Sequence, residues 1–174
     1  MQPDPTLGAS HGSVQVVLRT HRSGDIGWII QRHGEIYAHE YGWDTSFEAV
    51  VAEVCANFLR RYDPARERCW IAEVDGRRVG SVMLIQDREH ADAARLRVLL
   101  VEPDARGLGV GRMLVEECTR FARTSGYLRI LLWTNSLLAA ARKLYEREGY
   151  HLVETRPHNV YGHNMTGETW ELIL

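Results

Sequence analysis

A short glycine-rich segment offers the clearest chemistry in this chain, because it could hold a phosphate group. Residues 101–112 read VEPDARGLGVGR, in which three alternating glycines are flanked by two arginines. Glycine lets the backbone approach a ligand closely and adopt positive φ, and the free NH groups at a helix N-terminus favour an anion. An apolar strand precedes the segment and an amphipathic helix follows it, so the pattern predicts an anion-binding loop.

Two well-known phosphate loops do not fit this segment. A dinucleotide fingerprint needs G-x-G-x-x-G, and neither Gly107 nor Gly109 begins one; the P-loop pattern G-x-x-x-x-G-K-[ST] is absent. The segment does match R-x-x-G-x-G, which resembles motif A of the GNAT superfamily of acyl-CoA-dependent N-acetyltransferases. The resemblance implies that the pyrophosphate of coenzyme A is held by Arg106, Gly107, Leu108, Gly109, Val110, Gly111 and Arg112.

A second segment, residues 141–150, reads ARKLYEREGY and matches A-x-x-L-Y-x-x-x-G-[FY]. This pattern resembles the last helix of GNAT proteins, where the tyrosine meets the sulfur of the coenzyme. The resemblance makes Tyr145 the candidate proton donor to the leaving thiolate and places Ala141 beside the coenzyme. A phenol with an ordinary pKa of about 10 is protonated at neutral pH and can donate. Periodicity alone would favour a packed aromatic residue at this position.

The resemblance also implies that Leu99, Leu100 and Val101 present backbone groups to the pantetheine arm and the thioester, beside a β-bulge. Many relatives have an asparagine seven residues before the tyrosine, a position held here by Leu138. Asn135 either replaces that contact with the coenzyme or caps the next helix together with Ser136.

The general base is not identified by the sequence. Many relatives carry a glutamate on the strand before the loop, and Arg95 stands at that position here. Possible substitutes are Glu40, Glu73, His158 and His163, although the sequence favours an exposed loop or strand residue over a base at each of these positions. An amine that binds partly neutral would need no dedicated base.

Two segments rich in aromatic, histidine and acidic residues, 34–44 and 157–164, should shape the acceptor pocket. We expect a compact pocket for a small amine, an amino acid or related metabolite, lined by Tyr37, Glu40, Trp43, Arg95, His158 and His163. Glu40 or Asp44 would hold an ammonium group, and Arg19 or Arg95 a carboxylate. Core packing of the aromatic residues explains the same pattern.

The elements that must position these residues follow a clear order. Strands are predicted at residues 14–18, 69–74, 79–85, 96–101, 128–133, 150–155 and 168–174. Helices are predicted briefly near residues 26–30, from a capping box at Thr45-x-x-Glu48, over 109–124, and from Asn135 or Ser136 to Gly149. This order is that of the GNAT fold, an α/β (α+β) fold with a mixed six- to seven-stranded sheet and about four helices. Residues 1–12 are expected to form a flexible tail and residues 13–174 a single domain.

Composition limits the remaining possibilities. The chain has 174 residues and a net charge of −2, which favours one domain and argues against a general nucleic-acid binder. Three widely spaced cysteines and eight histidines show no disulfide framework or metal-ligand spacing, so we expect no metal. Without a membrane-length apolar run or a signal peptide, we expect a cytoplasmic protein with no membrane partner. The apolar strand at residues 170–174 either mediates a homodimer or completes the sheet.

The GNAT resemblance covers nearly the whole chain beyond the tail and is most like the acetyltransferase half of bacterial MarR–GNAT fusion proteins. DNA binding is not implied. The implied function is acetyl-CoA-dependent N-acetyl transfer to a small primary amine by direct attack in a ternary complex, with coenzyme A as product. The alternatives are acetylation of a protein lysine or N-terminus, and a non-catalytic acyl-CoA-binding sensor.

Overall fold

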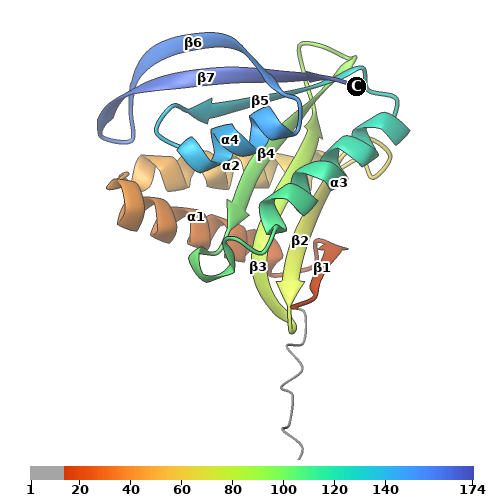
Figure 1. The fold of residues 1–174 in the computed structure, drawn as a ribbon, viewed down its shortest axis with the longest axis horizontal. Helices are drawn as coiled ribbons and strands as arrows, with labels where there is room; N and C mark the ends of the chain where they lie inside the picture. The colour runs from red at the N-terminus through yellow and green to blue at the C-terminus, as the bar shows by residue number, and fades with distance from the viewer. Residues whose placement is uncertain (1–13) are drawn as a thin grey trace, which may run out of the picture.

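The computed structural model describes residues 14–174, so the predicted tail at residues 1–12 lies outside the described part of the chain. Within it, Figure 1 shows one twisted sheet with helices on both faces. The strands are β1 (Val16–Thr20), β2 (Arg68–Val74), β3 (Arg77–Gln86), β4 (Ala93–Val101), β5 (Arg129–Asn135), β6 (His151–Val160) and β7 (His163–Ile173). The helices are α1 (Asp25–Tyr41), α2 (Thr45–Arg61), α3 (Val110–Thr124) and α4 (Ala139–Arg147), with a 3₁₀ turn η1 (Pro103–Ala105). The predicted order of strands and helices is confirmed.

The sheet is mixed, with seven strands in the order β1-β2-β3-β4-β5-β7-β6. β4 and β5 run parallel because α3 crosses between them, and every other neighbouring pair is antiparallel. The tight turn predicted between β2 and β3 is confirmed, with positive φ at both Asp75 and Gly76. β7 lies between β5 and β6, so both of its edges are paired. The terminal strand therefore completes the sheet.

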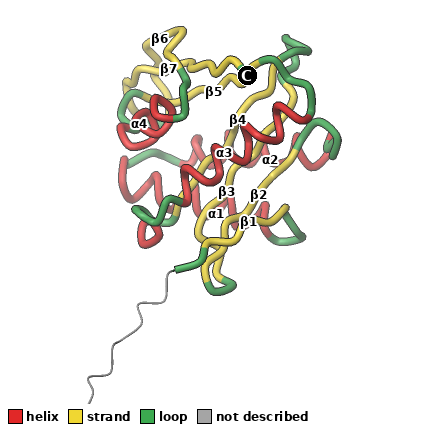
Figure 2. Tube along the Cα trace, turned by 45° about the vertical axis from the view of Figure 1, so that its right-hand side comes forward, coloured by secondary structure: helices red, strands yellow, loops and turns green. Residues whose placement is uncertain are grey.

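The helices form two layers around the sheet. Figure 2 shows α3 lying across the strands on one face, with α1 and α2 on the other. The α3 face buries the larger core, which includes Leu114, Cys118 and Tyr145, and the α1–α2 face buries Ile29, Cys55 and Cys69. All three cysteines are free and buried, as expected of small core residues. No helix among residues 14–174 is long and apolar enough to cross a membrane, and no cluster of potential metal ligands occurs there.

Helix α1 is much longer than the short helix predicted near residues 26–30. It continues to Tyr41 and includes most of the segment expected to be a connecting loop. The apolar stripe that begins at Ile26 and Ile29 continues through His33 and Ile36, all of them buried. Because this continuation passes through a histidine and is followed by polar residues, the sequence analysis ended the helix too early.

The N-cap residue of helix α2 lies one position earlier than predicted. Asp44, not Thr45, is the N-cap residue, and its Oδ1 accepts a hydrogen bond from the NH of Ser46 at 2.9 Å. Asp44 is not among the residues that line the site described below.

Candidate active site

The site begins where two parallel strands separate. β4 and β5 pair only from Ala93 to Arg95, opposite residues 129–131. Beyond Arg95 the strands diverge, and the edge of β4 that faces β5 has no strand partner among the described residues. A β-bulge lies in this stretch, as predicted: Val98 has φ 47°, and the pairing of β3 with β4 shifts register there. The Ser81 hydroxyl donates to the carbonyl of Val98 at 3.2 Å and so holds the bulge.

A cavity of about 620 Å³ occupies this opening. Its walls come from α1, α2, β4, the loop before α3, β5, α4 and the β6–β7 turn, so segments far apart in the sequence meet in one space. Most of the predicted site residues line it, namely Tyr37, Glu40, Trp43, Leu99, Leu100, Val101, Arg106, Gly107, Gly109, Val110, Gly111, Arg112, Asn135, Ala141 and Tyr145. Leu108 does not, and its side chain is exposed.

The glycine-rich loop has the geometry of an anion site. Gly107 and Gly109 have φ of 82° and 78°, and Gly109 is the N-cap residue of α3. A Cβ at either glycine would meet no atom within 4 Å, so positive φ rather than crowding accounts for these glycines. Within residues 14–174, the backbone NH groups from Gly107 to Arg112 donate to no carbonyl or side chain. They lie at the start of a fifteen-residue helix whose dipole favours an anion.

The two arginines of the loop are held loosely at its edge. Arg106 pairs with Glu40 at 2.8 Å, and Arg112 pairs with Glu116 at 2.8 Å. Both arginine side chains are at least half exposed, so these ion pairs contribute little stability and can rearrange around a ligand.

Tyr145 lies on α4 and lines the cavity. Its side chain is buried, and its ring packs 5.7 Å from that of Tyr150. Its hydroxyl has no hydrogen-bond partner within residues 14–174. Burial raises the pKa of the Tyr145 phenol above its ordinary value, so the hydroxyl keeps its proton at neutral pH.

Asn135 ends β5 at the same opening and is fully buried. Its Oδ1 accepts a hydrogen bond from the NH of Leu137 at 3.1 Å, which is a turn contact rather than the cap of α4. Its Nδ2 is buried and has no partner among the described residues. A buried amide donor normally has a hydrogen-bond partner, so the free Nδ2 is available to a ligand that enters the cavity.

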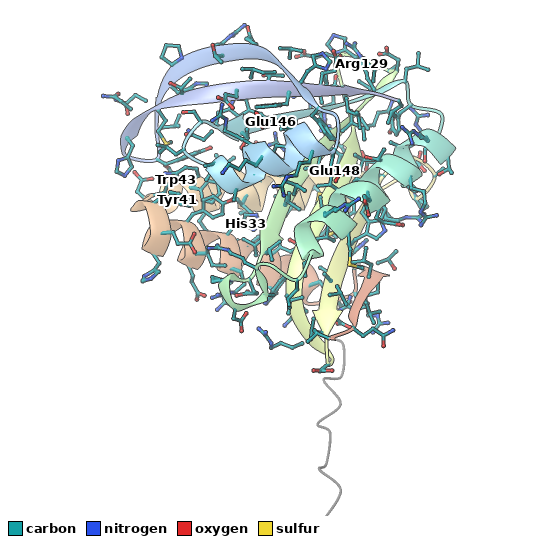
Figure 3. All side chains as sticks on the ribbon, viewed as in Figure 1. His33, Tyr41, Trp43, Arg129, Glu146 and Glu148 are labelled. Carbon is teal, nitrogen blue, oxygen red and sulfur yellow. The ribbon has the colours of Figure 1, made fainter. Side chains whose placement is uncertain are left out.

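The acceptor side of the cavity has aromatic walls. Rings of Tyr37, Trp43, Phe47 and Tyr161 pack with centroid distances of 4.7 to 5.0 Å. Figure 3 shows Trp43 and Tyr41 at the end of α1, beneath the β6–β7 hairpin, with His33 further along the helix. We call the four rings the aromatic compartment. All four rings pack together, and all four residues line the cavity.

Several predicted residues lie elsewhere. Arg95 pairs with buried Asp87, and Glu73 pairs with Arg19, so neither arginine is free for a carboxylate. His158 packs on Trp133 and lines a separate hollow on the β6–β7 hairpin. His163 lies outside the cavity lining and donates from Nε2 to the carbonyl of Gly42 at 3.0 Å, which ties the hairpin turn to the end of α1.

The structure also brings residues to the cavity that sequence reasoning missed. Arg97 lines it two residues after Arg95 on the same strand. His33 lines it from α1; its Nδ1 donates to the carbonyl of Ile29 at 2.7 Å, and burial lowers its pKa to about 4. Tyr161 lies in a segment that the sequence analysis singled out for its rings, although the residue itself was not among the predicted site residues.

Known proteins with similar sequence and structure agree with this architecture. The profile described as "Acetyltransferase (GNAT) family" matches residues 25–150. An uncharacterized N-acetyltransferase of Schizosaccharomyces pombe is 28% identical over 86% of this chain and 89% of its own length. The N-acetylaspartate synthetase of Danio rerio is 29% identical over 68% of this chain, which spans only 41% of that protein. The Salmonella typhimurium protein yncA, solved with its cofactor acetyl-CoA, superposes with a TM-score of 0.74 at 17% identity over 92% of this chain and 94% of its own.

The splayed parallel strands, the glycine-rich loop and the buried tyrosine together define an acyl-CoA-dependent transferase fold. The chain belongs to the GNAT acetyltransferase family. It is therefore an acyltransferase of the acetyltransferase type.

Proposed function

We propose that this protein transfers the acetyl group of acetyl-CoA to the primary amine of a small molecule, an amino acid or related metabolite, by direct attack in a ternary complex. The observation that carries the proposal is the single cavity. It joins a loop of free NH groups, the bulged edge of β4, the hydroxyl of Tyr145 and an aromatic compartment.

The coenzyme end of the cavity fits its expected ligand. The free NH groups from Gly107 to Arg112 would hold the diphosphate, and the loosely paired Arg106 and Arg112 would add positive charge. The unpaired backbone edge of β4 at Leu99 to Val101 would bind the pantetheine arm. The free Nδ2 of Asn135 is a further donor at this end, which supports its role as a coenzyme contact.

The chemistry needs little from the protein beyond positioning and one proton. Acetyl-CoA supplies a thioester carbonyl; a C–N bond forms to the acceptor amine as the C–S bond breaks. The Tyr145 hydroxyl gives its proton to the departing sulfur, and the amine loses one to solvent or to a nearby base. Holding two reactants in one cavity can supply up to about 7 to 11 kcal/mol of the barrier reduction.

The small-molecule acceptor is supported by the compartment and by one relative. The four rings and the His163 contact close the acceptor side with the β6–β7 turn. An open groove would suit a protein substrate better. The zebrafish relative is named for a product, N-acetylaspartate, that is an acetylated amino acid. The narrower resemblance to MarR–GNAT proteins, the homodimer and the cytoplasmic location stay predictions.

The direct test is to incubate the protein with acetyl-CoA and a metabolite extract, and to identify acetylated products by mass spectrometry. We expect one or a few acetylated small amines and release of free coenzyme thiol. Acetylation of added peptides but not of metabolites would favour a protein substrate. Tight coenzyme binding without any acetylated product would favour a sensor and contradict the proposal.

A further inference from the structure

Arg97 is an unpaired cation inside the cavity. It lies on β4, lines the cavity, and is only partly accessible to solvent. No carboxylate within residues 14–174 pairs with it. The other arginines near this part of β4 are used: Arg95 by Asp87 and Arg106 by Glu40. Arg147 at the rim is also unpaired among the described residues, but its side chain is exposed and solvated by water.

Keeping an unpaired guanidinium in this place is unfavourable for folding. Burial, with the nearby charge of Arg95, lowers the pKa of the Arg97 side chain from its ordinary value. A desolvated cation usually has a carboxylate partner, and when the protein does not provide one a ligand can. Among the described residues that line the cavity, Glu40 is the one with an acidic side chain, and it already pairs with Arg106.

The position of Arg97 assigns it to the acceptor rather than to the coenzyme diphosphate. It precedes the bulge at Val98, whereas the anion loop begins only after β4 ends at Val101. At about 3.3 Å per residue, that separates Arg97 from the loop by more than about 10 Å. Arg97 also acts electrostatically on Tyr161, whose ring lies 4.9 Å from that of Trp43, so it borders the aromatic compartment.

We propose that Arg97 binds a carboxylate of the acceptor, so that the acceptor is an amino acid with a free carboxylate group. This inference rests on the proposed function and narrows its substrate class. The guanidinium would hold the carboxylate by charge-assisted hydrogen bonds, and the amine would then face the thioester beside Leu99. A peptide N-terminus has a neutral amide where this carboxylate would be, so the site would disfavour it.

The test compares matched acceptors with matched variants. L-Leucine, L-phenylalanine and L-aspartate are each assayed beside the corresponding α-carboxamide. We expect the wild-type protein to favour the acid over the amide by roughly 10- to 100-fold in kcat/KM, the size expected for a charged hydrogen bond. Arg97→Met should reduce that ratio to near one while leaving the Kd for coenzyme A unchanged.

Arg95→Met is the control, because it removes an arginine from the same strand outside the cavity. It should keep the acid preference and lower Tm, since buried Asp87 loses its partner. Arg97→Met should instead keep or raise Tm, because it removes an unpaired cation. The two variants therefore separate loss of specificity from loss of stability.

Equal use of acid and amide by the wild-type protein, or an acid preference that survives in Arg97→Met, would overturn the inference and leave the proposed function intact. Failure of every amine in the panel and the metabolite extract would contradict the proposed function instead. In that case L-phenylalanine and its amide are titrated into coenzyme-saturated protein by calorimetry. Tighter binding of the acid that depends on Arg97 supports the inference, and equal or absent binding overturns it.

Discussion

Tyr145 is the residue on which the proposed chemistry depends most. Its hydroxyl is unpaired among residues 14–174, and burial keeps the phenol protonated. Tyr145→Phe should lower kcat by about 10²- to 10⁴-fold, the usual contribution of a positioned general acid. The Kd for acetyl-CoA should change little because the ring remains. Single-turnover thiol release measures the effect.

Tyr150→Phe is the matched control for that experiment. Tyr150 packs beside Tyr145 and is equally buried, but it does not line the cavity. Its kcat should stay near the wild-type value. If both variants retain activity, Tyr145 is a packed aromatic residue and not the proton donor.

His33 should make stability depend on pH. Burial lowers its folded-state pKa to about 4, below the value of about 6.5 expected in the unfolded chain. Between these values the unfolded chain binds a proton that the folded protein does not, so stability falls as pH drops from 6.5 to 4. The loss from this one group is about 3 kcal/mol, and above pH 6.5 it contributes no pH dependence.

Denaturant unfolding between pH 7 and pH 4 measures this slope. His33→Gln should flatten it, and His39→Gln, which changes an exposed histidine on the same helix, should not. An unchanged slope in His33→Gln would show that the buried ring does not control acid stability.

At the residue scale, the sequence predicted the loop residues and the tyrosine that line the cavity, whereas on the proposed acceptor side it predicted Tyr37, Glu40 and Trp43 but missed Arg97. Glycines at 107 and 109 and a tyrosine at 145 lie in contiguous patterns, so local spacing is enough to find them. Arg95 and Arg97 are chemically identical and two residues apart. Only the tertiary structure shows that Asp87 neutralises the first and that nothing in the described chain neutralises the second.

At the scale of elements, the two glycines that flank α3 allow an effect on ligand binding to be distinguished from an effect of backbone strain. Gly109 and Gly126 lie just before and just after this helix, both with φ of 78° and both without a neighbour that a Cβ would strike. Alanine at either position should cost roughly 1 to 2 kcal/mol of stability, because each must adopt the left-handed conformation. Only Gly109→Ala should also weaken the binding of coenzyme A.

Chemical denaturation and calorimetry on the two variants test this prediction together. Equal coenzyme affinity in Gly109→Ala and Gly126→Ala would mean that the loop geometry at the start of α3 does not hold the diphosphate.

Element prediction succeeded where periodicity and turn chemistry agree. The stripe of α3 and the Asp75–Gly76 turn are local signals, and both elements form as predicted. Helix α1 was underestimated because a histidine, His33, interrupts its buried apolar face between Ile29 and Ile36. The misplaced loop explains why Tyr37 and Glu40 were assigned to a connection although they lie on the last turns of a helix.

At the scale of the whole molecule, the order of elements predicted the fold but not which of the last two strands forms the edge of the sheet. Strand, helix and strand in succession require a parallel pair, so the contact of β4 with β5 was predictable. The insertion of β7 between β5 and β6 was not, because a hairpin can dock by either of its strands. That choice brings the β6–β7 turn, with Tyr161, over the end of α1 and closes the acceptor side.

We expect one cavity to hold the whole coenzyme, with its diphosphate on the loop and its sulfur at Tyr145. A crystal structure with coenzyme A tests it most directly. We expect diphosphate oxygens within hydrogen-bond distance of the NH groups between Gly107 and Arg112, and the sulfur beside the Tyr145 hydroxyl. A coenzyme bound outside the opening between β4 and β5, or with its diphosphate away from this loop, would contradict the account.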